Sequence, residues 1–117
     1  MRSAKPLSLP VLHIMLSLAD GPRHGYAIKQ DVEQRTDGSL RLGPGTLYEA
    51  IQRLEDGRLI EETAPAGGGE PANGQEAQRR YYRLTERGWN ALRHEMRGLS
   101  QLVDLARTNA RLRKGLA

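Results

Sequence analysis

The sequence LGPGTLYEAIQRLEDGRLI, residues 42–60, decides the fold of this chain. Pro44 suits the first turn of a helix, because the backbone N–H that proline lacks has no helical partner there. Apolar side chains then recur at helical spacing, at Leu47, Ile51 and Leu54. Gly57 is the residue type that adopts the left-handed conformation in which many helices end. The sequence therefore predicts a helix over residues 44–56 with one apolar stripe.

The opposite face of this predicted helix carries hydrogen-bonding side chains, at Thr46, Tyr48, Glu49, Gln52, Arg53 and Asp56. A helix with one stripe in a core and polar side chains outward has the form of a helix that recognises bases in the major groove. An ordinary surface helix is amphipathic in the same way. The pattern alone is therefore compatible with DNA recognition or with a structural role.

Further elements are expected on both sides of this helix. They are helices over residues 9–19 and 25–35, a short extended piece over 39–42, and hairpin strands over 59–63 and 79–84. Ser8 can cap the first of these helices, and Asp37-Gly38 can stop the second. This order predicts a winged helix-turn-helix, a mainly α fold with a small β-hairpin.

The two expected strands are joined by residues 64–78, whose proline and glycine content indicates a loop, the wing of the fold. The tip of this loop carries Glu70 and Glu76, and only Arg79 and Arg80 at its base are basic. We expect these two arginines to contact a phosphate or the minor groove of DNA, or else to form a solvated strand end.

The last part of the chain predicts one long helix. Thr85 can cap it, and it would run from Glu86 to about Arg113, which is about 40 Å at 1.5 Å per residue. Its apolar side chains follow alternating steps of three and four residues, at Trp89, Leu92, Met96, Leu99, Val103, Ala106 and Ala110. A heptad seam of this length packs against another helix, and so small a domain cannot cover it.

A homodimer accounts for this seam. The helix over residues 9–19 is apolar on two sides, which include Leu12 and Met15, so one side is expected to face a partner chain as well. We therefore expect residues 1–85 to form a winged helix-turn-helix DNA-binding domain and residues 86–117 to form a helical dimerisation arm.

The net charge gives only weak information about partners. The chain has 117 residues, enough for one domain with a modest core, and a net charge of +4. Residues 1–85 contain eleven basic and eleven acidic side chains, so the whole excess comes from residues 86–117, which hold seven basic and three acidic ones. A prediction of DNA binding therefore has to rest on local groups of basic side chains.

Several kinds of site are not expected. The chain has no cysteine, and its three histidines, His13, His24 and His94, fall on different helices without ligand spacing. No metal, cofactor or catalytic nucleophile is therefore expected, and an enzyme is not predicted. The apolar residues 9–19 are too short to span a bilayer, and no signal peptide is recognised, so a cytoplasmic protein is expected.

Taken together, these segments resemble the PadR family of bacterial transcriptional regulators. The segment GTLY at residues 45–48, with the residues that follow to Ile60, is similar to the recognition helix of the family. The tripeptide HGY at 24–26 is similar to the start of the second helix, and RYYRLTERG at 80–88 to the last wing strand and the start of the final helix. Glu49 departs from the proline of many relatives, but glutamate is acceptable in a first helical turn.

The resemblance, which extends over residues 7–112, implies a DNA-binding transcriptional regulator. We expect a repressor that binds a near-palindromic operator in double-stranded DNA as a homodimer. The residues expected to contact DNA are Gly45, Thr46, Tyr48, Glu49, Gln52, Arg53, His24, Arg79 and Arg80. His24 either shapes the start of the second helix or donates a hydrogen bond to a phosphate.

The resemblance also implies a site for a small planar aromatic effector between the long helices. It would lie around Trp89, Leu92 and Met96. Trp89 is nearer the helix start than the stacking tryptophan of multidrug-responsive members, which corresponds to Leu99, so Trp89 is also interpreted as a core or interface anchor. The competing function is a winged-helix module that binds a protein partner, which the acidic wing tip and the neutral residues 1–85 favour.

Overall fold

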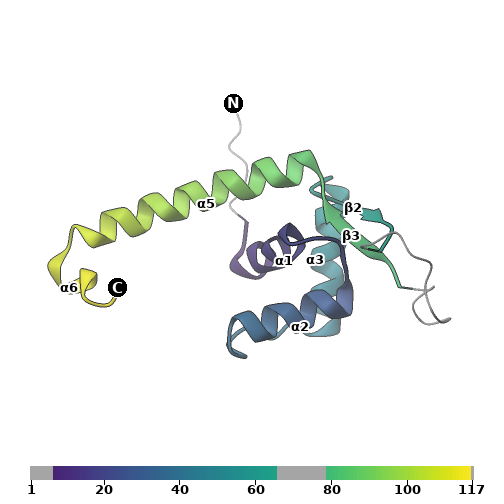
Figure 1. Ribbon diagram of the computed structural model, residues 1–117, viewed down its shortest axis with the longest axis horizontal. Helices are drawn as coiled ribbons and strands as arrows, with labels where there is room; N and C mark the ends of the chain where they lie inside the picture. Colours follow the sequence, from purple (N-terminus) through teal and green to yellow (C-terminus); the bar gives the residue numbers. More distant parts are fainter. Residues whose placement is uncertain (1–6, 66–78, 117) are drawn as a thin grey trace.

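The structure is a computed structural model that describes residues 7–65 and 79–116 (Figure 1). Its elements are α1 (Leu9–Ala19), β1 (Arg23–His24), α2 (Gly25–Arg35), α3 (Pro44–Asp56), β2 (Ile60–Thr63), β3 (Tyr81–Leu84), α5 (Glu86–Arg107) and α6 (Ala110–Arg113). Helices α1, α2 and α3 form a small domain with the sheet, and α5 extends away from it (Figure 1). The expected fold class is confirmed, whereas Glu70 and Glu76 of the expected wing tip lie outside the described residues.

The helices begin where the sequence predicts, because an N–H group of the first turn either donates to a side-chain acceptor or is missing where the residue is proline. The Ser8 hydroxyl accepts from the Val11 N–H at 3.4 Å, and the Thr85 hydroxyl accepts from the Gly88 N–H at 3.0 Å. Helix α3 has proline in its first turn and no side-chain cap. The bounds of α1, α2 and α3 are those expected from the sequence.

The sheet has three short strands. Strand β3 lies in the centre and pairs antiparallel with β1 on one side and β2 on the other. The expected hairpin is present, but the extended piece expected at residues 39–42 forms no strand. Arg23 and His24 form the additional strand instead, opposite Tyr82 and Tyr81. Two residues are too few to show an alternating pattern, so this strand could not be predicted from the sequence.

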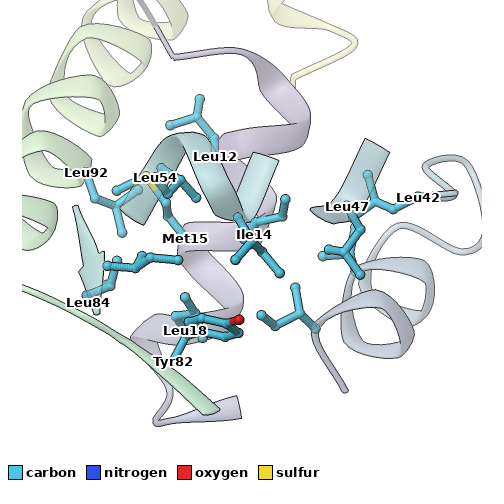
Figure 2. Packing of buried hydrophobic residues seen from close by; sticks show 14 residues of the cluster. Leu12, Ile14, Met15, Leu18, Leu42, Leu47, Leu54, Tyr82, Leu84 and Leu92 are labelled. Carbon is cyan, nitrogen blue, oxygen red and sulfur yellow. The ribbon is translucent and has the colours of Figure 1, made fainter. Parts of the chain in front are cut away.

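One apolar core joins α1, α2, α3, the sheet and the first half of α5. Ile14 of α1 is fully buried and lies at the centre of the view in Figure 2. Leu84 and Leu92 lie on one side of it, and Leu42 and Leu47 lie on the other (Figure 2). The residues of α1 around Ile14 are thus enclosed by the rest of their own domain.

The burial of α1 corrects one expectation about the dimer. Met15 is 0% exposed and Leu12 is 5% exposed within the single chain. Leu12 and Met15 are therefore used by the core of their own chain and have almost no surface to offer to a partner chain. Leu9, on the same stripe as Leu12, is 63% exposed. The apolar stripes were recognised correctly, but these two residues are covered by the chain itself.

The end of α3 also differs from expectation. Gly57 stays in a right-handed conformation, with φ −80°, and the left-handed residue is Arg58, with φ 59°. The Leu59 N–H donates to the carbonyl of Leu54 at 2.9 Å, and the Arg58 N–H donates to that of Glu55 at 2.9 Å. This is a Schellman motif one residue later than the glycine suggests.

A close backbone approach joins the start of α5 to the turn that follows α3. A Cβ on Gly88 would overlap the carbonyl oxygen of Leu59 and lie 3.0 Å from its carbonyl carbon, so only glycine fits. The Thr85 N–H donates to that same carbonyl oxygen at 3.1 Å, and the Thr85 hydroxyl donates to the carbonyl of Arg58 at 2.6 Å. The direction of α5 is therefore fixed relative to the end of α3.

The final helix is shorter than expected because it breaks after Arg107. The Thr108 hydroxyl donates to the carbonyl of Leu105 at 2.7 Å, and the Asn109 side chain caps α6 by accepting from the N–H groups of Arg111 and Leu112. The 22 residues of α5 extend about 33 Å at 1.5 Å per residue. Ala110, expected on the same seam, therefore belongs to the separate helix α6.

Helix α5 divides into two halves of different character. The first half packs on the domain, where Leu92 is buried and Trp89 and Met96 are partly buried against the core. Residues 97–107, called the distal arm below, are all exposed except the partly buried Ala106. Leu102 is 62% exposed and Leu105 is 67% exposed. Within the described residues, no helix is long and apolar enough to cross a membrane.

Candidate nucleic-acid interface

The outer face of α3 carries the polar side chains that the sequence predicted. Its inner stripe, Leu47, Ile51 and Leu54, is buried in the core. Thr46, Glu49, Gln52 and Arg53 are exposed, and Tyr48 is 65% exposed although tyrosine has a large apolar ring. The helix therefore presents a continuous row of donors and acceptors to solvent.

Two of these side chains differ in how they are held. The Gln52 amide donates to the carboxylate of Asp56 at 3.0 Å along the helix surface. Arg53 forms no ion pair with any residue in the described ranges. Its guanidinium is thus available to a base edge or a phosphate, while Gln52 would have to exchange Asp56 for a new partner.

Helix α3 lies close to the start of α2. A Cβ on Gly25 would lie 3.7 Å from side-chain atoms of both Ile51 and Leu47, at ordinary van der Waals distance. Helix α2 contacts α3 through this region, in the helix-turn-helix arrangement in which the first helix supports the recognition helix. The start of α2 therefore packs on the buried stripe of α3.

His24 forms the N-cap of α2. Its Nδ1 accepts a hydrogen bond from the backbone N–H of Ala27 at 3.1 Å, and its ring meets Tyr81 edge-on, with centroids 5.2 Å apart. Its Nε2 lies 3.1 Å from Nη1 of Arg79 at the base of the wing. The expected role of His24 at the start of the second helix is thus confirmed, and the same residue reaches the wing.

Arg80 lies beside Arg79 and is paired with an acidic residue. Its guanidinium is 3.4 Å from the carboxylate of Glu62 on β2, and both side chains are exposed. The Glu62 carboxylate raises the pKa of Arg80, which stays charged at any physiological pH. An exposed ion pair of this kind is weak and can open when a stronger anion approaches.

A cavity of about 250 Å³ lies where these elements meet. It is lined by His24, Gly25, Tyr26, Tyr48, Arg79, Arg80 and Tyr82. Burial raises the pKa of the Tyr82 phenol, so this hydroxyl stays protonated. The cavity thus combines two guanidinium groups with aromatic hydroxyls, which suits an anion.

The structure brings the predicted DNA-contacting residues into one region. Those on α3 share its outer face, and His24, Arg79 and Arg80 adjoin that face at Tyr48 through the cavity. Sequence analysis did not name Tyr26 or Tyr82 as part of this region. Tyr26 belongs to a tripeptide that had been recognised, but nothing in the sequence indicated that Tyr82 would line a surface cavity.

Comparison with known proteins places the chain among regulators of transcription. Residues 11–94 match the sequence profile of the transcriptional regulator PadR-like family. A transcriptional regulator of Mycobacterium tuberculosis is 36% identical over 93 residues, which cover 79% of this chain and 77% of that protein. An uncharacterized 37.1 kDa protein in transposon TN4556 of Streptomyces fradiae is 36% identical over 89 residues, which cover 76% of this chain and 22% of that longer protein.

The fold is similar to solved structures as well. The structure of a transcriptional regulator from Clostridium thermocellum superposes with a TM-score of 0.68 at 25% identity. The superposition covers 86% of this chain and 89% of that one.

Proposed function

We propose that this chain, which belongs to the transcriptional regulator PadR-like family, represses transcription by binding a near-palindromic DNA operator as a homodimer. It is a transcriptional regulator and not an enzyme, as the family is one of regulators. The observation that best supports DNA binding is the polar outer face of α3, which adjoins the two arginines at the wing base. Such a regulator acts in the cytoplasm, where the DNA is.

The contacts follow from the side chains on that face. Arg53 is suited to guanine, and Gln52 to adenine, because each can form two hydrogen bonds to the major-groove edge of that base. Thr46, Tyr48 and the backbone at Gly45 lie toward the start of α3, where phosphates are commonly bound. Glu49 adds a negative charge to this face, which would favour a cytosine amino group or oppose a nearby phosphate.

The distal arm supports the homodimer. Leu99, Leu102, Val103 and Leu105 expose apolar surface over two successive turns. A contiguous patch of this kind on a small protein indicates an interface, and a second copy of the same helix offers the same heptad spacing. A dimer joined there would place its two α3 helices on successive major grooves, about 34–36 Å apart.

The proposed interface is narrower than the sequence suggested. It rests on Leu99, Val103 and Ala106 of the predicted seam, together with Leu102 and Leu105, which the seam did not include. Leu92 is 4% exposed and, like Met15, belongs to the core of its own domain. We therefore place the start of the proposed dimerisation arm near Met96, beyond the part of α5 that packs on the core.

A planar aromatic effector would bind at the junction of these two parts. Because Leu92 is buried, only Trp89 and Met96 of the three expected residues keep surface for a ligand. The Arg93 guanidinium lies over the Trp89 ring at 5.8 Å from its centroid. A planar ligand would replace this cation on the ring or slide beside it at the dimer axis.

Binding of DNA from the region upstream of the protein's own coding sequence tests the function. Gel shift and footprinting should show a protected site with two-fold symmetry. Arg53→Ala should weaken binding, while Arg97→Ala, which removes an equal charge from an exposed position on α5, should not. Equal behaviour of the two variants, or capture of a protein in place of DNA, would favour the competing module that acts through a protein partner.

A further inference from the structure

Two side chains on the outer face of α3 are joined by a hydrogen bond one turn apart. Nε2 of Gln52 donates to Oδ1 of Asp56 at 3.0 Å, and both residues are exposed. Among the described residues Asp56 has no ion-pair partner, so no cation competes for its carboxylate. A glutamine and an aspartate four residues apart form a favourable pair on a helix surface. The bond therefore holds the Gln52 side chain along the outer face of the helix.

The chemistry of this pair fixes which way the Gln52 amide points. An ionised carboxylate only accepts hydrogen bonds, whereas an amide donates at its nitrogen and accepts at its oxygen. The amide nitrogen must therefore face Asp56, because the reversed amide would set its oxygen against a negatively charged oxygen. Oε1 of Gln52 consequently points away from Asp56, and no described residue donates to it.

The amide keeps a donor as well as this acceptor. Its nitrogen carries two hydrogens, so the exchange of Asp56 for a new partner concerns only the hydrogen that Asp56 holds. Oε1 and the second hydrogen remain for a base, in an order that Asp56 fixes. Adenine offers an N6 donor and an N7 acceptor in the major groove, and cytosine offers only its N4 donor. Guanine presents O6 and N7 and thymine presents O4, which are all acceptors that Oε1 would repel.

We propose that Asp56 is a positioning residue that makes Gln52 select adenine and reject guanine and thymine in the operator. The proposal rests on the proposed DNA-binding function and says how one base pair of the site is recognised. Without Asp56 the amide could turn over, present its nitrogen outward and donate to O6 or N7 of guanine or to O4 of thymine. Asp56 acts through Gln52 and needs no contact with DNA.

Base preference at a single position tests this role. Sites are selected from random DNA with the wild-type protein, and the base pair contacted by Gln52 is the one whose preference disappears in Gln52→Ala. Four duplexes that carry each base at that position are then titrated against the wild type, Asp56→Ala and Asp56→Asn. The wild type should bind the adenine duplex about tenfold or more tightly than the guanine duplex. This ratio should fall to within about threefold in both variants, because neither alanine nor an amide fixes the orientation of Gln52.

Glu55→Gln is the matched control, because it removes one negative charge from the neighbouring residue, which forms no hydrogen bond with Gln52. All three substitutions should strengthen binding to every duplex, since DNA repels a carboxylate, but Glu55→Gln should keep the wild-type ratio. When Gln52 is already alanine, adding Asp56→Ala should change no base preference. In the free protein, the NMR signals of the Gln52 side-chain NH2 group should shift in Asp56→Ala and stay unchanged in Glu55→Gln.

The outcomes separate this role from the function on which it rests. A wild-type ratio retained in Asp56→Ala or Asp56→Asn, or a preference for a base other than adenine at the position contacted by Gln52, overturns the role of Asp56 while DNA binding through α3 stands. If Gln52→Ala changes no base preference, Gln52 contacts no base and the role is overturned in the same way. If the wild type selects no DNA, the proposed function fails, and the role of Asp56 fails with it.

Discussion

Replacing Gly88 by alanine should destabilise the domain although the change adds only one methyl group. That methyl would overlap the Leu59 carbonyl oxygen, which is backbone and accepts the Thr85 N–H at 3.1 Å. Either α5 moves away from the turn after α3, or that hydrogen bond is lost. The substitution therefore acts on the junction that fixes the direction of α5.

The magnitude follows from three contributions. Inserting a methyl group into a packed position costs about 1–3 kcal/mol, with the upper end expected because the obstacle is backbone. Loss of the Thr85 hydrogen bond adds about 1 kcal/mol. Alanine offsets about 1 kcal/mol of this by its higher helix propensity than glycine. The free energy of unfolding of Gly88→Ala should therefore fall by about 2–3 kcal/mol.

Gly98→Ala is the matched control, since it makes the same change in the same helix. A Cβ there meets nothing within 4 Å, so only helix propensity changes, and stability should rise by up to about 1 kcal/mol. Urea unfolding of both variants and wild type at one protein concentration gives the comparison, because stability of a dimer depends on concentration. A Gly88→Ala protein as stable as Gly98→Ala would refute the close approach at Leu59.

Four further predictions concern other parts of the molecule. Leu99→Asp, at a position 41% exposed in the single chain, should leave the domain folded and abolish the dimer in sedimentation, and a stable dimer would contradict the proposed interface. Gln52→Ala should weaken operator binding by about 1–3 kcal/mol, and Tyr48→Phe should weaken binding to all DNA sequences alike. Titration against specific and random duplexes measures both effects, and unchanged affinity in both variants would remove α3 as the recognition helix. Titration with planar aromatic compounds should quench Trp89 fluorescence and lower operator affinity together, and quenching alone would indicate a site without regulatory effect. Arg58→Gly should raise the free energy of unfolding by up to about 1 kcal/mol, because Arg58 has φ 59°, and a loss of stability would show that its side chain contributes more than this strain costs.

Local signals in the sequence predicted most of the secondary structure. Ser8, Pro44 and Thr85 are chemically suited to the first turn of a helix, and each marks a helix start in the structure. Such signals depend on only a few neighbouring residues, so one sequence is enough to recognise them. The break of α5 was missed because Thr108 and Asn109 are tolerated inside helices and interrupt one only when their side chains bond to the backbone.

Tertiary contacts account for what the sequence could not predict. Met15 and Leu99 both lie on apolar stripes, yet Met15 is at the centre of the core and Leu99 projects from the domain. Helical period identifies a stripe but does not say which neighbour covers it. The polar outer face of α3 follows from helical period, so its residues were predicted individually. The cavity that joins Tyr26 and Tyr82 to the wing base depends on contacts between separate elements, so it was not predicted.

The difference between the two halves of α5 affects how well a newly made chain resists proteolysis. The domain core is complete without the distal arm, so a single copy can fold before it meets another. The distal arm of such a monomer is about half of a 22-residue helix without tertiary support, shorter than the 12–15 residues or so at which isolated helices become even marginal in water. We expect it to fray and to be cut by proteases until a second chain covers its leucines. The lifetime of a newly made chain would then depend on the concentration of the same protein already present in the cell.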